Sequence, residues 1–243
     1  MKLISFTGQA VMLVIILAGL SFQLDLVSVK SKLSFTVLVV LVSAFVALVG
    51  TVGLIRRYRQ NKRLSTEMVV LMSVCMLPLI LFFVAIGPKG LSTPDLHDIS
   101  TDTENPPMLA YAEVSRTHYD SPTLYRQDLV AQQVAAYPDI KTFHVALPKR
   151  DVFHMSAYAA SMLGWRVYNL NSRLGQIDLR DTTAFFAFKA DISIRVTAVG
   201  DDNSIIDVRS ASVKLGRDFG FNARRIRDFF AGFNAELEKR QTL

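Results

Sequence analysis

The chain contains a single cysteine, Cys75, which lies within an apolar run. An intrachain disulfide is therefore excluded, and any folded domain must be stable through its core alone. Acidic residues are scarce in the first 87 positions, which hold two of the 21 Asp and Glu residues but eight of the 27 Lys and Arg residues. The net charge of +6 thus arises between apolar runs. This placement argues against a nucleic-acid partner, which the basic composition alone would favour.

Three long apolar runs fill the N-terminal part, at residues 3–24, 33–55 and 68–87. Each is close to the roughly 20 residues that a helix needs to cross about 30 Å of hydrocarbon. We therefore expect three transmembrane helices within residues 1–87, and the bilayer as a partner. The first run also fits a signal peptide, so its retention or cleavage stays open.

The basic loop at residues 56–63 carries five positive charges between the second and third runs. Cytoplasmic loops collect Lys and Arg, so this loop is expected to face the cytoplasm. The sequence thus predicts a multi-pass protein of a bacterial inner membrane, with a cytoplasmic N-terminus and a periplasmic C-terminal domain. The runs themselves lack charged residues in their middle, which argues against a transporter acting alone.

The C-terminal part predicts an α+β fold. Residues 88–122 are rich in Pro, Ser, Thr and Asp and are expected to form an extended linker. Residues 123–243 predict a soluble domain in which helices cover one face of an antiparallel sheet. Helices are expected over residues 122–136, over 151–163 with Asp151 as N-cap, and from Asn222 as N-cap onward. The last helix carries an apolar stripe that is expected to lie in the core: Ile226, Phe229, Phe230, Phe233 and Leu237.

The clearest strand covers residues 184–199, where apolar even positions alternate with polar odd positions. This alternation predicts one buried face and one wetter face. After a turn at residues 200–203, a second strand returns over 204–212. Its Ile206 and Val208 share the apolar face only if even-numbered residues stand opposite even-numbered ones.

This parity leaves few registers for the hairpin. With Ala198 opposite Ser204, Arg195 stands opposite Asp207. A shift of two residues would instead place Arg195 opposite Arg209, a like-charge pair that destabilises a sheet. We therefore predict an Arg195–Asp207 pair at the surface, where such a pair contributes about 0–1 kcal/mol.

Four segments occur in the order "HDISTDTENPP", "YPDI", "IDVRSAS" and "DFGFNARRIR". In this order they resemble a bacterial and plastid family known as domain of unknown function 1499, over about residues 95–235. The resemblance implies an envelope or thylakoid-lumen protein, often with apolar N-terminal helices, and no established activity. After Ser212 the chain departs from the family's usual pattern of an Arg and a nearer Gly, which weakens any ligand role for that loop.

The first of these segments carries an acidic strap, residues 97–104, with the side chains His97, Asp98, Asp102 and Glu104. These groups are possible metal ligands, but the spacing lacks the glycine of an EF-hand, and no H-E-x-x-H helix occurs. No G-x-S-x-G motif occurs either. We therefore expect no cofactor and no catalysis, with a metal-assisted hydrolase that uses the strap as the alternative.

The start of the last helix is a second candidate site, because a helix N-terminus carries partial positive charge that favours anions. The candidate residues for an anion or a partner are Arg209, Ser210, Arg217, Asn222, Arg224 and Arg225. Arginines that simply face water fit the sequence equally well. Since the strap is acidic, we also expect it to dock against the arginine-bearing end of this helix.

These features favour a membrane-anchored envelope protein without catalytic activity. Its outer domain is expected to bind a membrane or periplasmic protein, an anionic small molecule or a lipid headgroup. An accessory subunit of a larger membrane complex is a further alternative.

Overall fold

The computed structural model describes residues 29–61, 66–87, 89–118, 120–184, 187–214 and 218–241. The chain divides into two compact units. The first unit contains the N-terminal helices with residues 184–187, and the second consists of Ser92–Thr183 and Phe188–Leu243. The helix predicted over residues 3–24 lies outside the described residues.

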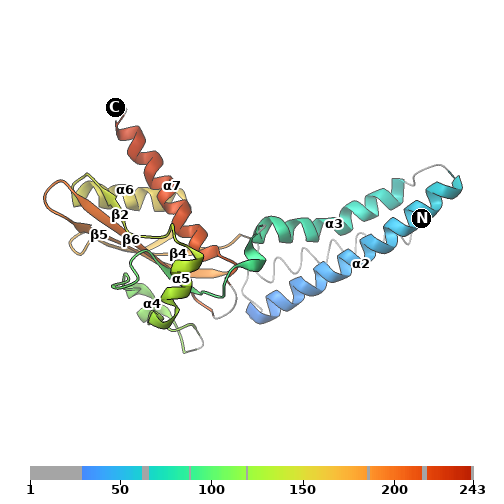
Figure 1. Ribbon diagram of the computed structural model, residues 1–243, viewed down its shortest axis with the longest axis horizontal. Helices are drawn as coiled ribbons and strands as arrows, with labels where there is room; N and C mark the ends of the chain where they lie inside the picture. Colours follow the sequence, from blue (N-terminus) through green and yellow to red (C-terminus); the bar gives the residue numbers. More distant parts are fainter. Residues whose placement is uncertain are drawn as a thin grey trace. The chain divides into compact units, whose positions relative to one another are not determined.

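In the first unit, α2 (Val29–Asn61) and α3 (Thr66–Ile86) pack against each other as a helical hairpin (Figure 1). Polar and small side chains of α2 are buried, among them Thr36, Ser43 and Ala47. Large apolar side chains of the same helix are exposed instead, such as Phe45 at 66% and Leu48 at 65%. This inverted distribution is typical of helices that are surrounded by lipid rather than water.

Among the described residues, one segment is long and apolar enough to cross a membrane, Ser34–Gln60 in α2. This criterion rests on length and composition alone. Three spans were predicted, and within the described residues one candidate membrane helix is supported.

The second unit is built on one antiparallel sheet with the strand order β1-β6-β5-β4-β3, and β2 also pairs with β6. The strands are β1 (Asp98–Ser100), β2 (Phe143–Val145), β3 (Arg166–Asn171), β4 (Gln176–Thr182), β5 (Lys189–Ala198) and β6 (Ser204–Ser212). The helices are α4 (Ala110–Ser115), α5 (Val130–Ala136), α6 (Lys149–Met162) and α7 (Phe221–Gln241), with a 3₁₀ turn at Gln127–Leu129. A further 3₁₀ turn, Gly90–Ser92, spans the point in the chain where the first unit ends and the second begins. The predicted α+β class and antiparallel sheet are confirmed.

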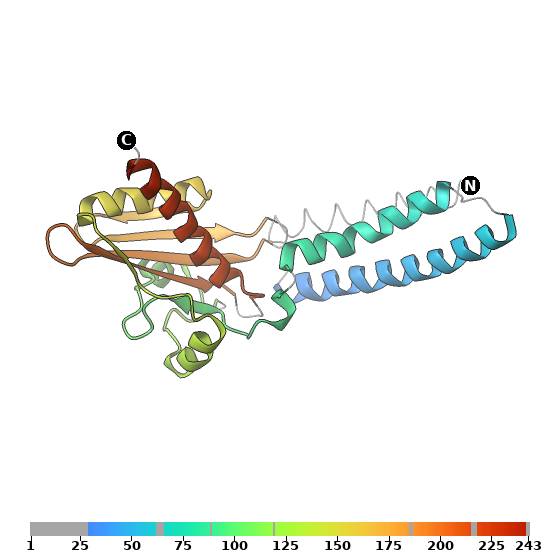
Figure 2. The ribbon, with the colours of Figure 1, turned by 45° about the horizontal axis from the view of Figure 1, so that its top comes forward.

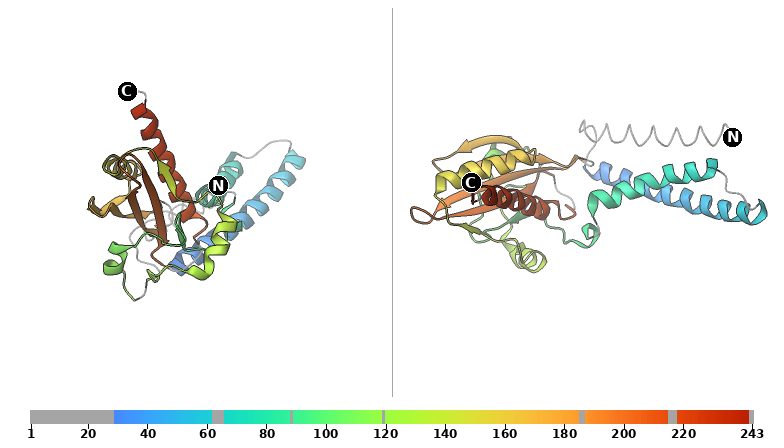
Figure 3. Two further views of the ribbon diagram at one scale, coloured as in Figure 1. Left: turned by 60° about the vertical axis from the view of Figure 1, so that its left-hand side comes forward. Right: turned by 90° about the horizontal axis from the view of Figure 1, so that it is seen from above.

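Helices α6 and α7 lie on one face of the sheet (Figures 2 and 3). Ile192 and Ile194 of β5 are buried against this layer together with Phe229 and Phe233 of α7. Complete burial of each such side chain contributes about 1.5–3 kcal/mol. The apolar stripe predicted for the last helix therefore forms part of the core.

The predicted register of the long hairpin is confirmed. Ala198 stands opposite Ser204, and Arg195 stands opposite Asp207. The even positions of β5 face the two covering helices, so the odd positions point to the other side of the sheet.

The alternation predicted that this other side would be exposed to water, but much of it is buried. Asp191 and Ser193 are only 2% and 0% exposed, because chain preceding β2 covers them. Arg116, which follows α4, reaches Asp191, and Leu109 and Ala112 pack with Ala211 of β6. The composition of this segment is typical of a linker, but its backbone pairs with β6 through β1.

The predicted helix starts near residues 122 and 151 are displaced. The first helix begins with the 3₁₀ turn at Gln127–Leu129 and continues as α5. In α6 the N-cap is Pro148, and Asp151 lies in the first turn. The backbone N–H groups of Asp151 and Val152 both bond to the carbonyl of Pro148, so the helix starts earlier than Asp151.

Candidate functional site

The polar face of the sheet holds a buried carboxylate, Asp207, at its centre. Arg195 Nη2 donates to Asp207 Oδ2 at 2.9 Å, and the hydroxyls of Thr101 and Thr142 donate to Oδ1 at 3.2 and 2.6 Å. Arg195 Nη2 also donates to Asp102 Oδ2 at 2.8 Å. The Asp207 side chain is 1% exposed. The predicted pair therefore exists, but it lies in the interior because the strap covers it.

A second buried pair joins the strap to β6. Arg209 donates through Nε and Nη2 to the two carboxylate oxygens of Asp98, at 3.0 and 2.6 Å. Its remaining donors reach the carbonyl oxygens of Pro107 and Thr123, and its guanidinium lies 5.3 Å from the ring centre of Tyr125. Burial raises the pKa of Asp98 above its usual value, against the opposing effect of Arg209. Arg209 is thus fully engaged within the protein.

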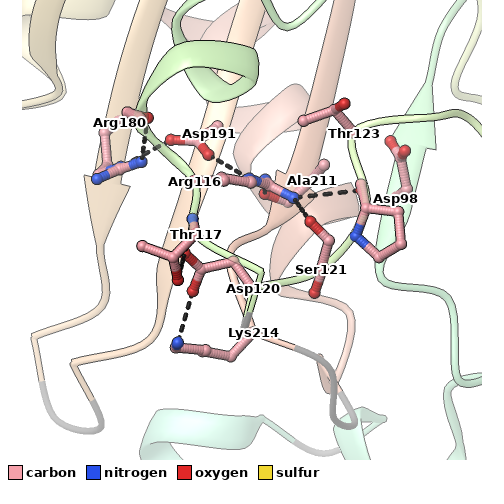
Figure 4. A network of polar contacts seen from close by, with 12 residues as sticks. Asp98, Arg116, Thr117, Asp120, Ser121, Thr123, Arg180, Asp191, Ala211 and Lys214 are labelled. Carbon is pink, nitrogen blue, oxygen red and sulfur yellow. Dashed lines mark hydrogen bonds and ion pairs between the residues drawn. The ribbon is translucent and has the colours of Figure 1, made fainter.

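A third buried carboxylate, Asp191, lies between two arginines (Figure 4). Arg116 Nε donates to its Oδ2 at 2.7 Å, and Arg180 Nε donates to its Oδ1 at 2.6 Å. Arg116 also donates to the carbonyl oxygens of Ser121 and Ala211, at 2.9 and 3.0 Å. This guanidinium therefore ties the chain after α4 to the middle of the sheet.

The strap was predicted to dock on the arginines at the start of the last helix, but its acidic side chains bind arginines of the sheet instead. Asp98 binds Arg209 of β6, and Asp102 binds Arg195 of β5. The side chain of Glu104 is exposed. The physical reason is the antiparallel pairing of β1 with β6, which holds the strap along the sheet and places Asp98 beside Arg209.

The N-terminus of α7 is capped by Asp218. Its carboxylate accepts hydrogen bonds from the backbone N–H groups of Gly220 and Asn222, at 2.8 and 3.0 Å. Burial raises the pKa of Asp218, and these two hydrogen bonds oppose the increase. A carboxylate of the chain itself therefore occupies the position that a bound anion would take.

Asn222, predicted as the N-cap, has a different role. Its Nδ2 donates to the carbonyl oxygen of His97 at 2.9 Å and to Ser212 Oγ at 3.0 Å. Its Oδ1 accepts from Ser210 Oγ at 2.9 Å and from Arg225 Nη1 at 3.2 Å. Asn222 is completely buried. It clamps the start of the strap to β6 and α7, which brings three of the four recognised segments together.

The arginines of α7 face carboxylates of the same domain. Arg225 Nε donates to Asp181 Oδ2 at 2.6 Å, and Arg227 binds Asp139 through two hydrogen bonds. The guanidinium of Arg224 lies 5.4 Å from the ring centre of Phe221, within the same helix. Arg225 Nη2 is buried and has no hydrogen-bond partner among the described residues. Arg217 lies outside the described residues.

Several contributors were missed at the level of sequence, and Gln133 and Arg116 are the clearest. The Gln133 amide accepts from the backbone N–H of Ser100 and donates to its carbonyl oxygen, at 3.1 and 2.7 Å. The Gln133 side chain thereby satisfies the backbone N–H and C=O of Ser100, as a neighbouring strand would. Arg116 is another, because its four acceptors include Asp191 and Ala211, which lie 75 and 95 positions away in the chain. A lone Gln or Arg in a loop or helix carries no signal for such a role.

Within the described ranges, no three His, Cys, Asp or Glu side chains are grouped so that they could hold a metal ion. Asp98 and Asp102 each face a guanidinium. The strap is therefore arranged as part of an ion-pair network.

Comparison with known families gives one match. A family model described as protein of unknown function (DUF1499) covers residues 98–233, more than half of the chain, and includes almost the whole of the network. No curated protein matches the chain.

Proposed function

The chain belongs to the DUF1499 family, and we propose that it is a membrane-anchored binding protein without catalytic activity, whose outer domain holds a partner protein. The observation that carries this proposal is the internal use of the domain's charged groups. Asp98, Asp191 and Asp207 are all buried against arginines of the same domain. Groups held in this way stabilise a fixed surface and are poorly placed to transfer protons to a substrate.

The same geometry ranks the possible ligands. An anionic small molecule or lipid headgroup at the start of α7 would have to compete with Asp98 for Arg209, with Asp181 for Arg225 and with the capping carboxylate of Asp218. A partner protein needs none of these groups, because it can use exposed side chains. We therefore favour a protein over a small anion.

For location, the proposal is a bacterial inner-membrane protein with several N-terminal spans, a cytoplasmic N-terminus and a periplasmic outer domain. Its support is the apolar segment Ser34–Gln60 and the five positive charges at residues 56–63, of which three lie at the end of α2 and two follow it. A reporter enzyme that is active only in the periplasm, fused after Leu243, is expected to be active. Activity of a cytoplasm-specific reporter at the same position would contradict this orientation.

The function is tested by purification of the full-length chain from its native membrane in a mild detergent after chemical cross-linking. We expect one protein to be retained in a fixed ratio, and to be absent with an unrelated membrane protein carrying the same tag. The metal-assisted hydrolase is the competing reading. A metal ion bound in a one-to-one ratio and lost in the double variant Asp98→Asn/Asp102→Asn would favour that reading and contradict ours.

A further inference from the structure

Strand β3 forms the open edge of the sheet. The strand order places β4 on one side of β3, and no described strand pairs with the other side. An open edge presents a row of backbone N–H and C=O groups that can pair with another chain. A register irregularity between Val167 and Asn169 shortens the regular part of the edge without covering it.

Exposed apolar side chains lie along this edge. We call them the edge surface: Met162, Leu163, Val167, Leu170 and Leu174, which are 69%, 37%, 37%, 55% and 65% exposed. Val167 and Leu170 stand opposite Leu179 and Ile177 of β4, so they belong to the apolar face of the sheet. They lie on the same face as the core, but they are partly exposed to water. Such a surface is typical of an interaction site.

The charged side chains that β3 and its flanking residues contribute are all positive. Residues 152–175 contain no Asp or Glu. Arg166 and Arg173 are exposed, and within the described part of the chain neither makes an ion pair. Arg166 lies over the ring of Tyr168, 5.0 Å from its centre, which keeps its charge beside the strand. These two arginines differ from Arg116, Arg180 and Arg209, which all bind carboxylates of the domain.

We propose that β3 binds an extended segment of a partner protein in which acidic and apolar side chains alternate. The segment adds to the sheet as a further antiparallel or parallel strand. Because successive side chains of a strand point to opposite faces, its apolar residues contact Val167 and Leu170 while its acidic residues lie on the other face, where Arg166 points. This inference rests on the proposed binding function and assigns its surface and the chemistry of its partner.

The test uses the full-length protein in detergent micelles and two short synthetic peptides, one with alternating Glu and Val and the other with alternating Lys and Val. We expect the Glu peptide to bind about tenfold more tightly, the size expected from two added ion pairs. Its binding should also slow amide hydrogen exchange in residues 166–171. The double variant Arg166→Glu/Arg173→Glu should reverse the preference. Equal affinities, or a preference that this variant leaves unchanged, would overturn the proposal.

A matched pair of apolar variants separates this inference from the proposed function. Leu170→Asp should abolish binding of the Glu peptide and release the co-purified partner. Leu124→Asp, at a site that is 83% exposed and far from β3 in the chain, should change neither. A partner that is retained by Leu170→Asp overturns the edge inference but leaves the binding function intact, whereas the wild type without any partner contradicts that function. A dimer that Leu170→Asp dissociates assigns the edge to a second copy and overturns the acidic partner.

Discussion

Arg195 Nη2 lies 2.9 Å from Asp207 Oδ2 on the neighbouring strand and 2.8 Å from Asp102 Oδ2 of the strap. One nitrogen therefore connects a cross-strand pair to the segment that covers it. The two carboxylates differ in burial, since the side chain of Asp207 is 1% exposed and that of Asp102 is 23% exposed. The more buried Asp207 should therefore contribute more to stability than Asp102.

We expect Asp207→Asn to lower the free energy of unfolding by about 1.5–3 kcal/mol, because it removes a buried charge that accepts from Arg195, Thr101 and Thr142. Asp102→Asn removes a partly solvated partner and should cost about 1 kcal/mol or less. Urea denaturation of the two variants measures the difference. Equal losses would show that the strap and the sheet depend on Arg195 to the same extent.

The docking of the strap predicts a contrast between two of its acidic residues. Asp98→Asn should lower the melting temperature and expose residues 97–107 to proteases, because Arg209 then loses both of its charged bonds. Glu104→Gln is the matched control, since its side chain is exposed and its removal should change stability by about 0.5 kcal/mol or less. Limited proteolysis followed by mass spectrometry locates the cuts. Equal protection of the strap in wild type and Asp98→Asn would contradict the docking.

Asp120 gives a prediction about pH. Burial acts to raise its pKa, but hydrogen bonds from Lys214 and Thr117 outweigh it and lower the pKa to about 2, from 3.8. A carboxyl whose pKa falls on folding stabilises the protein above its unfolded pKa, and this contribution is lost as the pH falls through the folded pKa. Asp120→Asn should therefore lower the melting temperature near pH 7 and have little effect near pH 2.

The control for this experiment is Asp201→Asn, in the exposed turn between β5 and β6. Thermal unfolding of both variants and the wild type across this pH range isolates the contribution of Asp120. A loss of stability in Asp120→Asn that is the same at both ends of the range would mean that the charge of Asp120 is not what stabilises the loop.

Gly220 combines a left-handed backbone with a close contact. Its φ is +79°, and an added Cβ would lie 3.1 Å from Thr93 Cγ2. Gly200 has a similar φ of +83° and nothing within 4 Å. Gly200→Ala should cost about 1 kcal/mol from the backbone alone, and Gly220→Ala should cost more because Thr93 must also move. Chemical denaturation measures the free energy of unfolding of both variants. Equal losses would show that Thr93 moves away from the added Cβ at no cost.

The sequence was informative where partners are close in the chain. Arg195 and Asp207 are separated by 12 positions and one turn, so parity and charge leave few registers. Asp98 and Arg209 are separated by 111 positions, and several other arginines fit the strap equally well by charge. The pairing of β1 with β6 decides between them, and a three-residue strand is too short to be recognised from alternation.

The cap of α7 shows the same limit at short range. Asp218 and Asn222 are both good N-cap residues, and local preference does not decide between them. The side-chain amide of Asn222 donates to the backbone carbonyl of His97 instead, which leaves Asp218 as the cap. Burial of the odd face of β5 was also beyond prediction, because the residues that cover it look like a linker.

The 111 positions between Asp98 and Arg209 also have a kinetic meaning. During synthesis at roughly 5–20 residues per second, the strap emerges roughly 6–20 s before the strand that holds it. In that interval Asp98 has no Arg209 to bind, and β1 has no strand to pair with. The domain can therefore complete its sheet only when its chain is almost finished, because β6 lies between β1 and β5. A chain that is cut short before β6 is expected to lack the folded domain.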